Sequence, residues 1–373
     1  MRIPVSRSCV LVLTAALLAV GGCGGSNKRV ELQGIFAPTG SMTEARYGHT
    51  ATRLPSGKVL ITGGSALYTT GAELYDPRTG TFAAAGNMTL PRQHHTATLL
   101  GNGKVLLAGG IADNINPSTA SAELFDPVAG TSTATGTMTQ ARVWQTATLL
   151  PNGDVLITGG YSTGDAFASA EVYDATTGTF AATGDMTVGR SGHTATTLPN
   201  GKVLIAGGYG GPVAEVYDSA TGTFAVTGDM TLARVGHTAV LLSNGEVLLA
   251  GGFQTSTNSS STVSGTVNFS TICELYDPGA GTFATTGNMI AGRAAHTAAT
   301  LLDGKILIAG GNSNQTLASA ELYDPATQVF AATGSMTAPR AEFTATLLSS
   351  GEVLIAGGQS VMPPMLTSAD LYE

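Results

Sequence analysis

Residues 186–228 read MTVGRSGHTATTLPNGKVLIAGGYGGPVAEVYDSATGTFAVTG, and this pattern decides the fold. It contains four short runs typical of strands: HTATTL, then VLIA closed by two glycines, then AEVYD, then TFAVT. The turn at Asn200-Gly201 tolerates the positive φ angles of a tight hairpin. Because VLIA is apolar throughout, we expect it to be an inner strand packed on both faces. The stretch therefore predicts one four-stranded antiparallel sheet.

The same pattern occurs seven times along the chain. Its opening methionines are separated by 46, 50, 48, 44, 59 and 47 residues: Met42, Met88, Met138, Met186, Met230, Met289 and Met336. A period near fifty residues with four strands in each unit is typical of propeller blades. The sequence therefore predicts an all-β fold, a seven-bladed β-propeller over residues 35–373.

The last repeat lacks its fourth strand, because the chain stops at Leu371-Tyr372-Glu373. Residues 36–42 read FAPTGSM, and residues 330–336 read FAATGSM, which is the fourth strand of the repeat before. We therefore expect the N-terminal segment to complete the last blade. Pro38 suits an outermost strand, where one donor of the ladder is dispensable.

The repeats resemble the kelch family. The resemblance rests on the double glycine after the second strand, on an aromatic residue in the third strand, and on a second aromatic after a fixed turn. The family usually has Trp at that last position, and here it is Phe82, Phe180, Phe224, Phe283 or Phe330, with Ser132 in the second repeat. The resemblance covers residues 35–373 and implies the kelch propeller fold of the galactose-oxidase-like group.

Residues 1–22 have the pattern of a lipoprotein signal peptide. Arg2 and Arg7 precede the apolar run Val10–Val20, which is too short to span a bilayer as a helix. The stretch VGGC ending at Cys23 resembles a bacterial lipobox, which predicts lipidation of Cys23; the alternative is ordinary cleavage near Gly22 with an incidental cysteine. Residues 23–34 then form a flexible tether. We expect a bacterial cell-envelope location, outer membrane or surface, reached through the lipid anchor alone.

Composition and charge limit the partners and bonds that the chain can form. The net charge is −8, and only 11% of the residues are charged. A modestly acidic surface argues against binding of nucleic acid. Cys273 is the only cysteine of the predicted propeller, so no internal disulfide can form there. We expect a monomer without a cofactor.

Strand alternation places the loops on two faces. The loops before the first strand (d–a loops) and after the second strand (b–c loops) share one face, and the short a–b and c–d turns share the other. The b–c loops vary from Tyr209–Val213 to the long Phe253–Ile272, whose role the sequence does not indicate. Variable loops on a rigid frame tend to carry function, so we place any binding site on the d–a/b–c face.

Residues present in every repeat are expected to be structural. One arginine recurs in each d–a loop, and one acid recurs in each third strand, from Arg46 and Glu73 to Arg340 and Asp370. We expect them to form buried ion pairs. The five histidines that open the first strand are too far apart in separate blades to share a metal.

Departures from the repeat are the better candidates for ligand binding. Trp144, the only tryptophan, takes a position filled elsewhere by Gly48, His94, Gly192, Gly236, Ala295 or Glu342, and Gln145 and Phe343 replace the repeated histidine. We expect these positions to surround the propeller axis. The candidate ligand-binding residues are Trp144, Tyr47, His94, Gln145, Glu342 and Phe343. The alternative is that Trp144 packs as a plug at the top of the channel.

Two further signals are weak. Residues 113–116 read DNIN and could offer oxygen ligands to calcium, but they lack the glycine and glutamate of an EF-hand loop. Cys273 takes the place of a small residue in a third strand, which indicates a buried packing role. We therefore assign no metal site.

The sequence favours a binding module for a protein or carbohydrate ligand of the envelope or host over an enzyme, because it contains no compact catalytic motif. The alternative is a galactose-oxidase-like enzyme or a sugar mutarotase. The resemblance implies a Cys–Tyr cross-link for the copper oxidases, which the position of Cys273 does not favour. A mutarotase requires only a carboxylate and basic partners, and Glu342, His94 and an arginine could serve.

Overall fold

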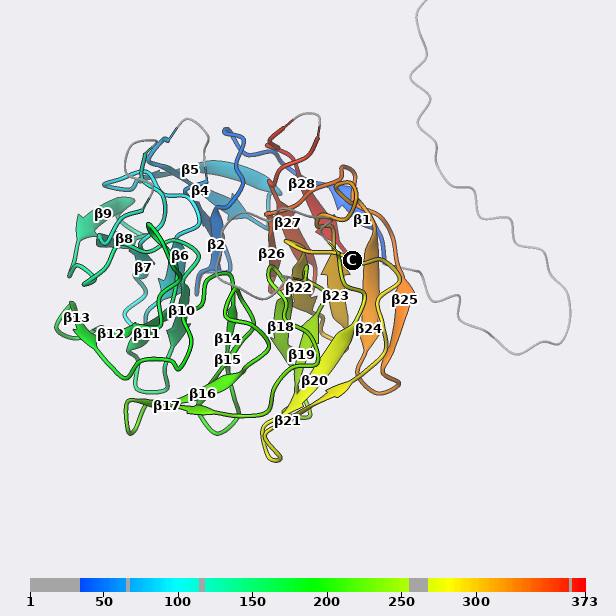
Figure 1. The fold of residues 1–373 in the computed structure, drawn as a ribbon. Helices are drawn as coiled ribbons and strands as arrows, with labels where there is room; N and C mark the ends of the chain where they lie inside the picture. Colours follow the sequence, from blue (N-terminus) through cyan, green and yellow to red (C-terminus); the bar gives the residue numbers. More distant parts are fainter. Residues whose placement is uncertain (1–33, 65–67, 114–117, 255–267, 362–363) are drawn as a thin grey trace, which may run out of the picture. The chain divides into compact units, whose positions relative to one another are not determined.

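The computed structural model describes residues 34–64, 68–113, 118–254, 268–361 and 364–373. All of them belong to one compact unit, Gln33–Glu373. Within these ranges the chain forms strands and turns and no helix (Figure 1). The expected leader, Cys23 and nearly all of the tether lie outside the described residues, as do most of the long b–c loop and Asn114–Asn116.

The described strands form seven four-stranded antiparallel blades, as the sequence predicted. The first strand of each blade lies nearest the middle of the ring in Figure 1, and the fourth lies at its outside. The first strands are β2 (Thr50–Arg53), β6 (Thr96–Leu99), β10 (Thr146–Leu149), β14 (Thr194–Thr197), β18 (Thr238–Leu241), β22 (Thr297–Thr300) and β26 (Thr344–Leu347). The second strands are β3 (Val59–Thr62), β7 (Val105–Ala108), β11 (Val155–Thr158), β15 (Val203–Ala206), β19 (Val247–Ala250), β23 (Ile306–Ala309) and β27 (Val353–Ala356).

Second strands are buried along their whole length, which explains their unbroken apolar sequence. The third strands are β4 (Gly71–Asp76), β8 (Ala122–Asp126), β12 (Ala170–Asp174), β16 (Glu215–Asp218), β20 (Cys273–Asp277), β24 (Ala320–Asp324) and β28 (Ala369–Tyr372). The fourth strands are β5 (Thr81–Asn87), β9 (Thr131–Ala134), β13 (Thr179–Ala182), β17 (Thr223–Val226), β21 (Thr282–Thr285), β25 (Val329–Ala332) and β1 (Phe36–Pro38). The fourth strands other than β1 are mostly exposed, in contrast to the buried second strands.

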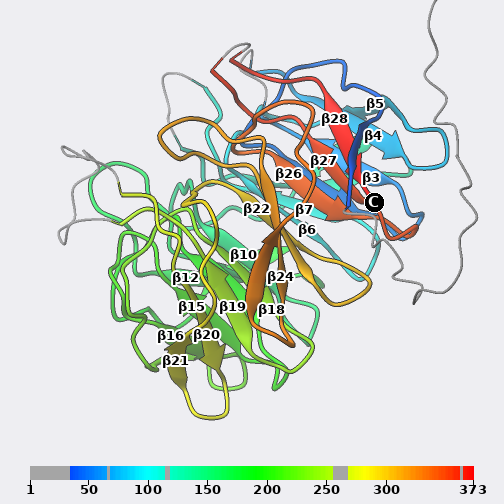
Figure 2. The ribbon, with the colours of Figure 1, turned by 90° about the vertical axis from the view of Figure 1, so that its right-hand side faces the viewer.

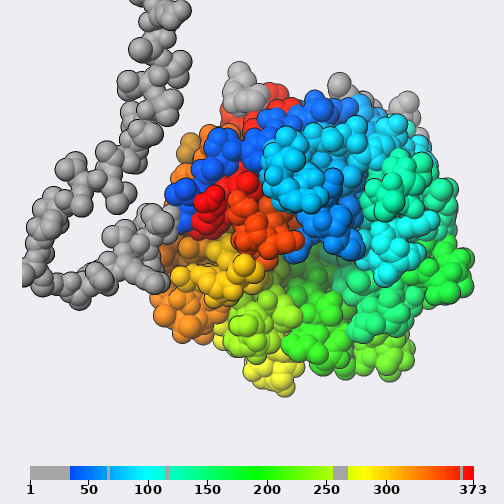
Figure 3. All heavy atoms as spheres, turned by 180° about the vertical axis from the view of Figure 1, so that it is seen from behind, coloured from blue at the N-terminus to red at the C-terminus, as the bar shows by residue number. Residues whose placement is uncertain are grey.

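The N-terminal strand closes the ring. Strand β1 pairs antiparallel with β28, with Phe36 opposite Tyr372, and their rings lie 4.8 Å apart. Phe330 and Tyr323 have the same register and the same ring separation in the blade before. In Figures 2 and 3 the blue N-terminal strand lies against the red C-terminal one. Gly34, which the sequence assigned to the tether, already belongs to the propeller, because its carbonyl accepts a hydrogen bond from the Gly334 amide at 3.0 Å.

A ring of backbone hydrogen bonds joins the blades on the d–a/b–c face. The second glycine of each pair donates its amide hydrogen to the carbonyl of the repeated arginine of the next blade, at 2.7–2.9 Å. In the described residues these bonds run from Gly64, Gly110, Gly160, Gly208, Gly252, Gly311 and Gly358 to Arg92, Arg142, Arg190, Arg234, Arg293, Arg340 and Arg46. An added Cβ on Gly64 would lie 2.5 Å from His49 Cβ, so this close approach requires glycine.

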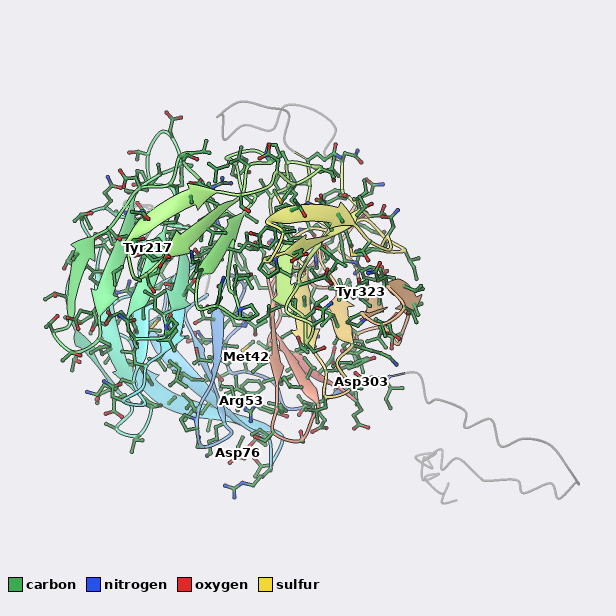
Figure 4. The ribbon with its side chains drawn as sticks, turned by 90° about the horizontal axis from the view of Figure 1, so that it is seen from below. Met42, Arg53, Asp76, Tyr217, Asp303 and Tyr323 are labelled. Carbon is green, nitrogen blue, oxygen red and sulfur yellow. The ribbon has the colours of Figure 1, made fainter. Side chains whose placement is uncertain are left out.

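A side-chain hydrogen bond joins most neighbouring blades near their outer strands. A threonine after one fourth strand bonds the tyrosine hydroxyl of the next third strand at 2.8–2.9 Å, as between Thr183 and Tyr217. Figure 4 labels two of these tyrosines, Tyr217 and Tyr323. Between the first two blades both partners are replaced together, by Ala85 and Phe125. A bridge between Asn87 and Thr131 joins these two blades instead.

Within the described ranges, no helix is long and apolar enough to cross a membrane.

Candidate functional site

The repeated arginines bind the repeated acids, as expected. Each arginine is at most 2% exposed and lies 2.6–3.2 Å from its carboxylate partner on the third strand. Its Nη1 also donates to the carbonyl of the first glycine of its own blade, at 2.7–3.0 Å. These side chains hold each d–a loop on its sheet, so they are committed to the fold.

The repeated histidines are also structural. Each of the five is 5–6% exposed, and its Nε2 lies 2.9–3.2 Å from a threonine hydroxyl of the preceding blade. Burial, followed by the positive charge of the neighbouring arginine, lowers the pKa of His49, His193 and His296 to about 3. They are therefore neutral hydrogen-bonding partners between blades at neutral pH.

The seven positions that include Trp144 form a ring about the propeller axis, which we call the axial ring. All seven have left-handed backbone conformations, with φ between 50° and 65°. They are Gly48, His94, Trp144, Gly192, Gly236, Ala295 and Glu342. Five amide-to-carbonyl hydrogen bonds of 2.8–3.1 Å link consecutive members, as from Gly48 to Glu342 and from His94 to Gly48. Side chains at positive φ are energetically unfavourable, so His94, Trp144 and Glu342 are retained at a conformational cost.

His94 and Glu342 meet although they belong to blades that are not adjacent. His94 Nε2 lies 3.7 Å from Glu342 Oε2, and the imidazole crosses over Gly48, where an added Cβ would lie 2.6 Å from His94 Cε1. Gln359 donates to the other carboxylate oxygen, Oε1, at 2.9 Å. The absence of a side chain at Gly48 therefore permits this contact.

Burial alone shifts both groups toward their neutral forms. It lowers the pKa of His94 to about 4 and raises the pKa of Glu342. Because His94 is uncharged at neutral pH, the pair is not an ion pair there. A neutral imidazole beside a carboxyl group with a raised pKa is a pair that can exchange a proton with a ligand.

Aromatic side chains extend from this pair around one side of the axial ring. The ring of His94 lies 6.1 Å from that of Tyr47 and 5.6 Å from that of Trp144, and Tyr161 lies 6.2 Å beyond Trp144. Trp144 is 45% exposed. The other side of the axial ring carries Gly192, Gly236 and Ala295. The axial ring is therefore chemically asymmetric, with aromatic and titratable groups on one side and small residues on the other.

Four of the six sequence-predicted residues come together here: Tyr47, His94, Trp144 and Glu342. Gln145 and Phe343 do not, because they are 6% and 5% exposed and fill the histidine position between blades. Gln145 Nε2 donates to the Ala108 carbonyl at 2.9 Å. Both residues thus replace a packing histidine, so their difference from the repeat reflects packing and not the ligand surface.

Tyr161 and Gln359, which follow the double glycine of their blades, are not among the residues predicted from the sequence. This position pairs in isolated bridges with the residue before the axial ring, as Tyr161 does with Val143 and Gln359 with Ala341. It is held by Ile111, Tyr161, Tyr209, Phe253, Asn312 and Gln359 in the described chain. This variability, next to an invariant glycine pair, is the signal that could have identified it.

The opposite face offers shallow depressions between turns. One of about 340 Å³ is lined by Asn200, Glu246 and Asp277 among others, and one of about 230 Å³ lies at the corresponding turns around Asn102 and Asp154. Arg53 and Asp76, labelled in Figure 4, end the strands from which such turns leave in the first blade. Because both depressions recur at equivalent turns, we attribute them to the repeat geometry.

The donor set does not fit a copper radical site. Cys273 is fully buried in β20, and burial raises its pKa to about 12. Among the residues that the structure describes, no three His, Cys, Asp or Glu side chains form a group that could hold a metal ion. The one histidine of the axial ring, His94, contacts Tyr47, Trp144 and Glu342.

Comparisons with known proteins agree with the architecture. A family model described as Kelch motif matches residues 293–337. A solved structure of a fungal alcohol oxidase of the AA5 family, in complex with copper, is similar over 91% of this chain and 76% of that chain, with a TM-score of 0.76 and 20% identity. At that identity the likeness shows the fold alone. No curated protein matches the chain.

Proposed function

We propose that this chain, a kelch-repeat β-propeller with the fold of the galactose-oxidase-like group, is a binding module of the bacterial cell envelope. Its ligand, a protein segment or a carbohydrate, docks on the d–a/b–c face at the axial ring. The observation that carries this proposal is Trp144, which is 45% exposed although its backbone has φ of 55°. A strained, solvent-facing aromatic beside other aromatics supports ligand contact.

The test uses calorimetric titration of the chain with envelope glycans and peptides. Trp144→Ala should weaken binding of any ligand at least tenfold, because a central aromatic anchor dominates such interfaces. Leu302→Ala is the matched control, since Leu302 is 75% exposed on the turn face. Unchanged binding by the Trp144→Ala variant would rule out the axial ring as the docking site.

The envelope location rests on the leader and Cys23. Lipidation at Cys23 would anchor the propeller to a membrane without a spanning segment. Metabolic labelling with a palmitate analogue in a bacterial host should mark the chain, and Cys23→Ser should abolish the label. A labelled Cys23→Ser variant would exclude this anchor.

Mutarotation of a sugar is the second candidate function. The neutral His94 beside Glu342, whose pKa burial raises, supports it, because ring opening needs a group that donates a proton and one that accepts it. Polarimetry of freshly dissolved glucose or galactose provides the test. A rate equal to that of buffer would exclude the activity for these sugars.

A further inference from the structure

The carboxylate of Glu342 is only half satisfied. Oε1 accepts a hydrogen bond from Gln359 Nε2 at 2.9 Å. Oε2 is buried and, within the described residues, has no hydrogen-bond partner, since His94 Nε2 stays 3.7 Å away. An unsatisfied buried acceptor is energetically costly. The geometry therefore leaves one carboxylate oxygen for a donor that comes from outside the chain.

The neighbouring cations are already committed. Arg340, two residues before Glu342, binds Asp370 at 3.2 Å and the Gly357 carbonyl at 2.9 Å. Arg46, two residues before Gly48, binds Glu73 and the Gly63 carbonyl. Burial raises the pKa of Glu342, and a bound cation would favour its charged form.

Two aromatic rings contact His94, whose Nε2 lies 3.7 Å from this oxygen. The Tyr47 and Trp144 rings flank the His94 ring, with centroids 6.1 Å and 5.6 Å away from its centroid. Aromatic faces attract ammonium groups through their quadrupoles. A carboxyl group without a cationic partner among the described residues, in contact with a histidine that packs on aromatic rings, favours a positively charged ligand over a neutral one.

The single free oxygen selects among cations. A guanidinium prefers two parallel carboxylate acceptors, and Gln359 already occupies one of them. A hard metal ion requires several oxygen ligands. An ammonium group is a compact charge that one oxygen and aromatic faces can hold.

We propose that Glu342, together with Tyr47 and Trp144, the aromatic residues that contact His94, binds an organic ammonium group of the ligand. This inference rests on the proposed function, because it names the chemistry recognised at the same axial ring. The group can belong to a lysine side chain of a peptide or to a small free amine.

The experiment titrates the full chain and follows the emission of Trp144, the only tryptophan. The probes are N-acetyl-lysine methylamide, its neutral norleucine analogue, the arginine analogue and methylamine. The lysine probe should shift the emission saturably, and the norleucine and arginine analogues should bind at least tenfold more weakly. Methylamine binding as tightly as the lysine probe would assign the site to free amines, and weaker binding would assign it to peptide lysines.

Glu342→Gln keeps the size of the side chain and removes its charge. It should weaken lysine-probe binding at least tenfold while the melting temperature stays within a few degrees. Glu352→Gln, on the turn face, is the matched control and should bind as the parent does. Equal binding of the lysine and norleucine probes, or no lysine binding at millimolar concentration, would overturn the ammonium site.

The outcomes separate this inference from the function on which it rests. If the lysine probe fails but a glycan binds in a manner that requires Trp144, the ammonium site is wrong and the binding module stands. If Trp144→Ala binds every ligand normally, both are wrong.

Discussion

His94 Nε2 lies 3.7 Å from Glu342 Oε2 across the bare backbone of Gly48. The three residues come from the second, seventh and first blades, and amide-to-carbonyl hydrogen bonds of 2.8 and 3.0 Å join them through Gly48. The contact depends on ring closure, because it requires the seventh blade to lie beside the first, where Gly48 bonds Glu342 and Gly358 bonds Arg46 through their backbones. The chemistry at the axis is therefore coupled to the completeness of the fold.

Gly48→Ala should displace His94 from Glu342. The new Cβ would lie 2.6 Å from His94 Cε1, and the backbone has φ of 59°. We expect altered Trp144 emission and a loss of about 1–2 kcal/mol of stability from the left-handed backbone. Gly153→Ala is the matched control, with φ of 92° and no atom within 4 Å of the added Cβ. Identical Trp144 spectra for both variants would contradict the crossing of His94 over Gly48.

The closing strand should contribute as much as any other fourth strand. Phe36→Ala removes a ring 4.8 Å from Tyr372, and Phe82→Ala removes one 4.9 Å from Tyr75. We expect similar losses of unfolding free energy, about 1–3 kcal/mol each for these half-buried rings. Deleting residues 34–41 should lower the unfolding midpoint far more. A deletion variant as stable as the parent in urea titration would refute closure by β1.

A buried ion pair should contribute far more to the free energy of unfolding than an exposed one. Glu215→Ala leaves the fully buried Arg190 without its carboxylate at 3.1 Å, which should cost about 3–5 kcal/mol in urea unfolding. The Lys202–Asp218 pair in the same blade is partly exposed at 3.0 Å. Lys202→Ala should leave the unfolding midpoint nearly unchanged. Equal effects of the two substitutions would show that the repeated arginines are not the ties of the d–a loops.

Restoring the Thr–Tyr hydrogen bond between the first and second blades should show that its two substitutions stabilise the fold cooperatively. Phe125→Tyr alone buries a hydroxyl without a partner, which should cost about 1–3 kcal/mol. Adding Ala85→Thr supplies the partner found at the other described junctions, so the double variant should regain most of this loss. A double-mutant cycle in urea measures the coupling. Strict additivity would mean that the β-bulge at Ala72/Glu73 keeps position 85 out of reach.

Stability should decrease in mild acid. Burial lowers the pKa of His49, His193 and His296 to about 3 in the folded state, below the ordinary value of 6.5. Below pH 6.5 the unfolded state binds protons that the folded state rejects, so stability falls from pH 6.5 toward pH 3. Each histidine should remove about 1–2 kcal/mol between pH 7 and pH 5. His193→Gln, which copies the natural Gln145, should flatten this dependence; an unaltered pH profile would contradict it.

The completion of the last blade by the N-terminal strand was predictable, because it follows from the repeats of the sequence. Seven copies of one pattern specify seven sheets, and the match of residues 36–42 to residues 330–336 identifies the missing strand. The buried Arg–carboxylate ties also followed from repetition, since a charge at an interior position of every blade requires a partner. Trp144, Tyr47, His94 and Glu342 were singled out correctly as neighbours of the axis, although their role in binding remains a prediction.

A departure from the repeat does not reveal whether the residue faces solvent or is buried between blades. Gln145 and Phe343 differ from histidine just as Trp144 differs from glycine, yet only Trp144 faces solvent. One residue along the chain changes the direction of the side chain, from the axial ring to the space between blades. The direction of the side chain follows from the left-handed backbone at the axial-ring positions. In the sequence, only the glycines at three of these seven positions indicate this backbone conformation.

The repeat pattern specifies the number of blades, the order of their strands and the strand that completes the last one, because hydrophobic period, turn chemistry and repetition are local properties of the chain. Three contacts became visible only in the folded structure: His94 reaches Glu342, Gln359 occupies one carboxylate oxygen of Glu342, and Tyr161 lies beside Trp144. The first contact joins residues of different blades, and it depends on ring closure and on the open space over Gly48. The other two each join the d–a loop of one blade to the b–c loop of the same blade, and these loops meet only when the sheet of that blade has formed.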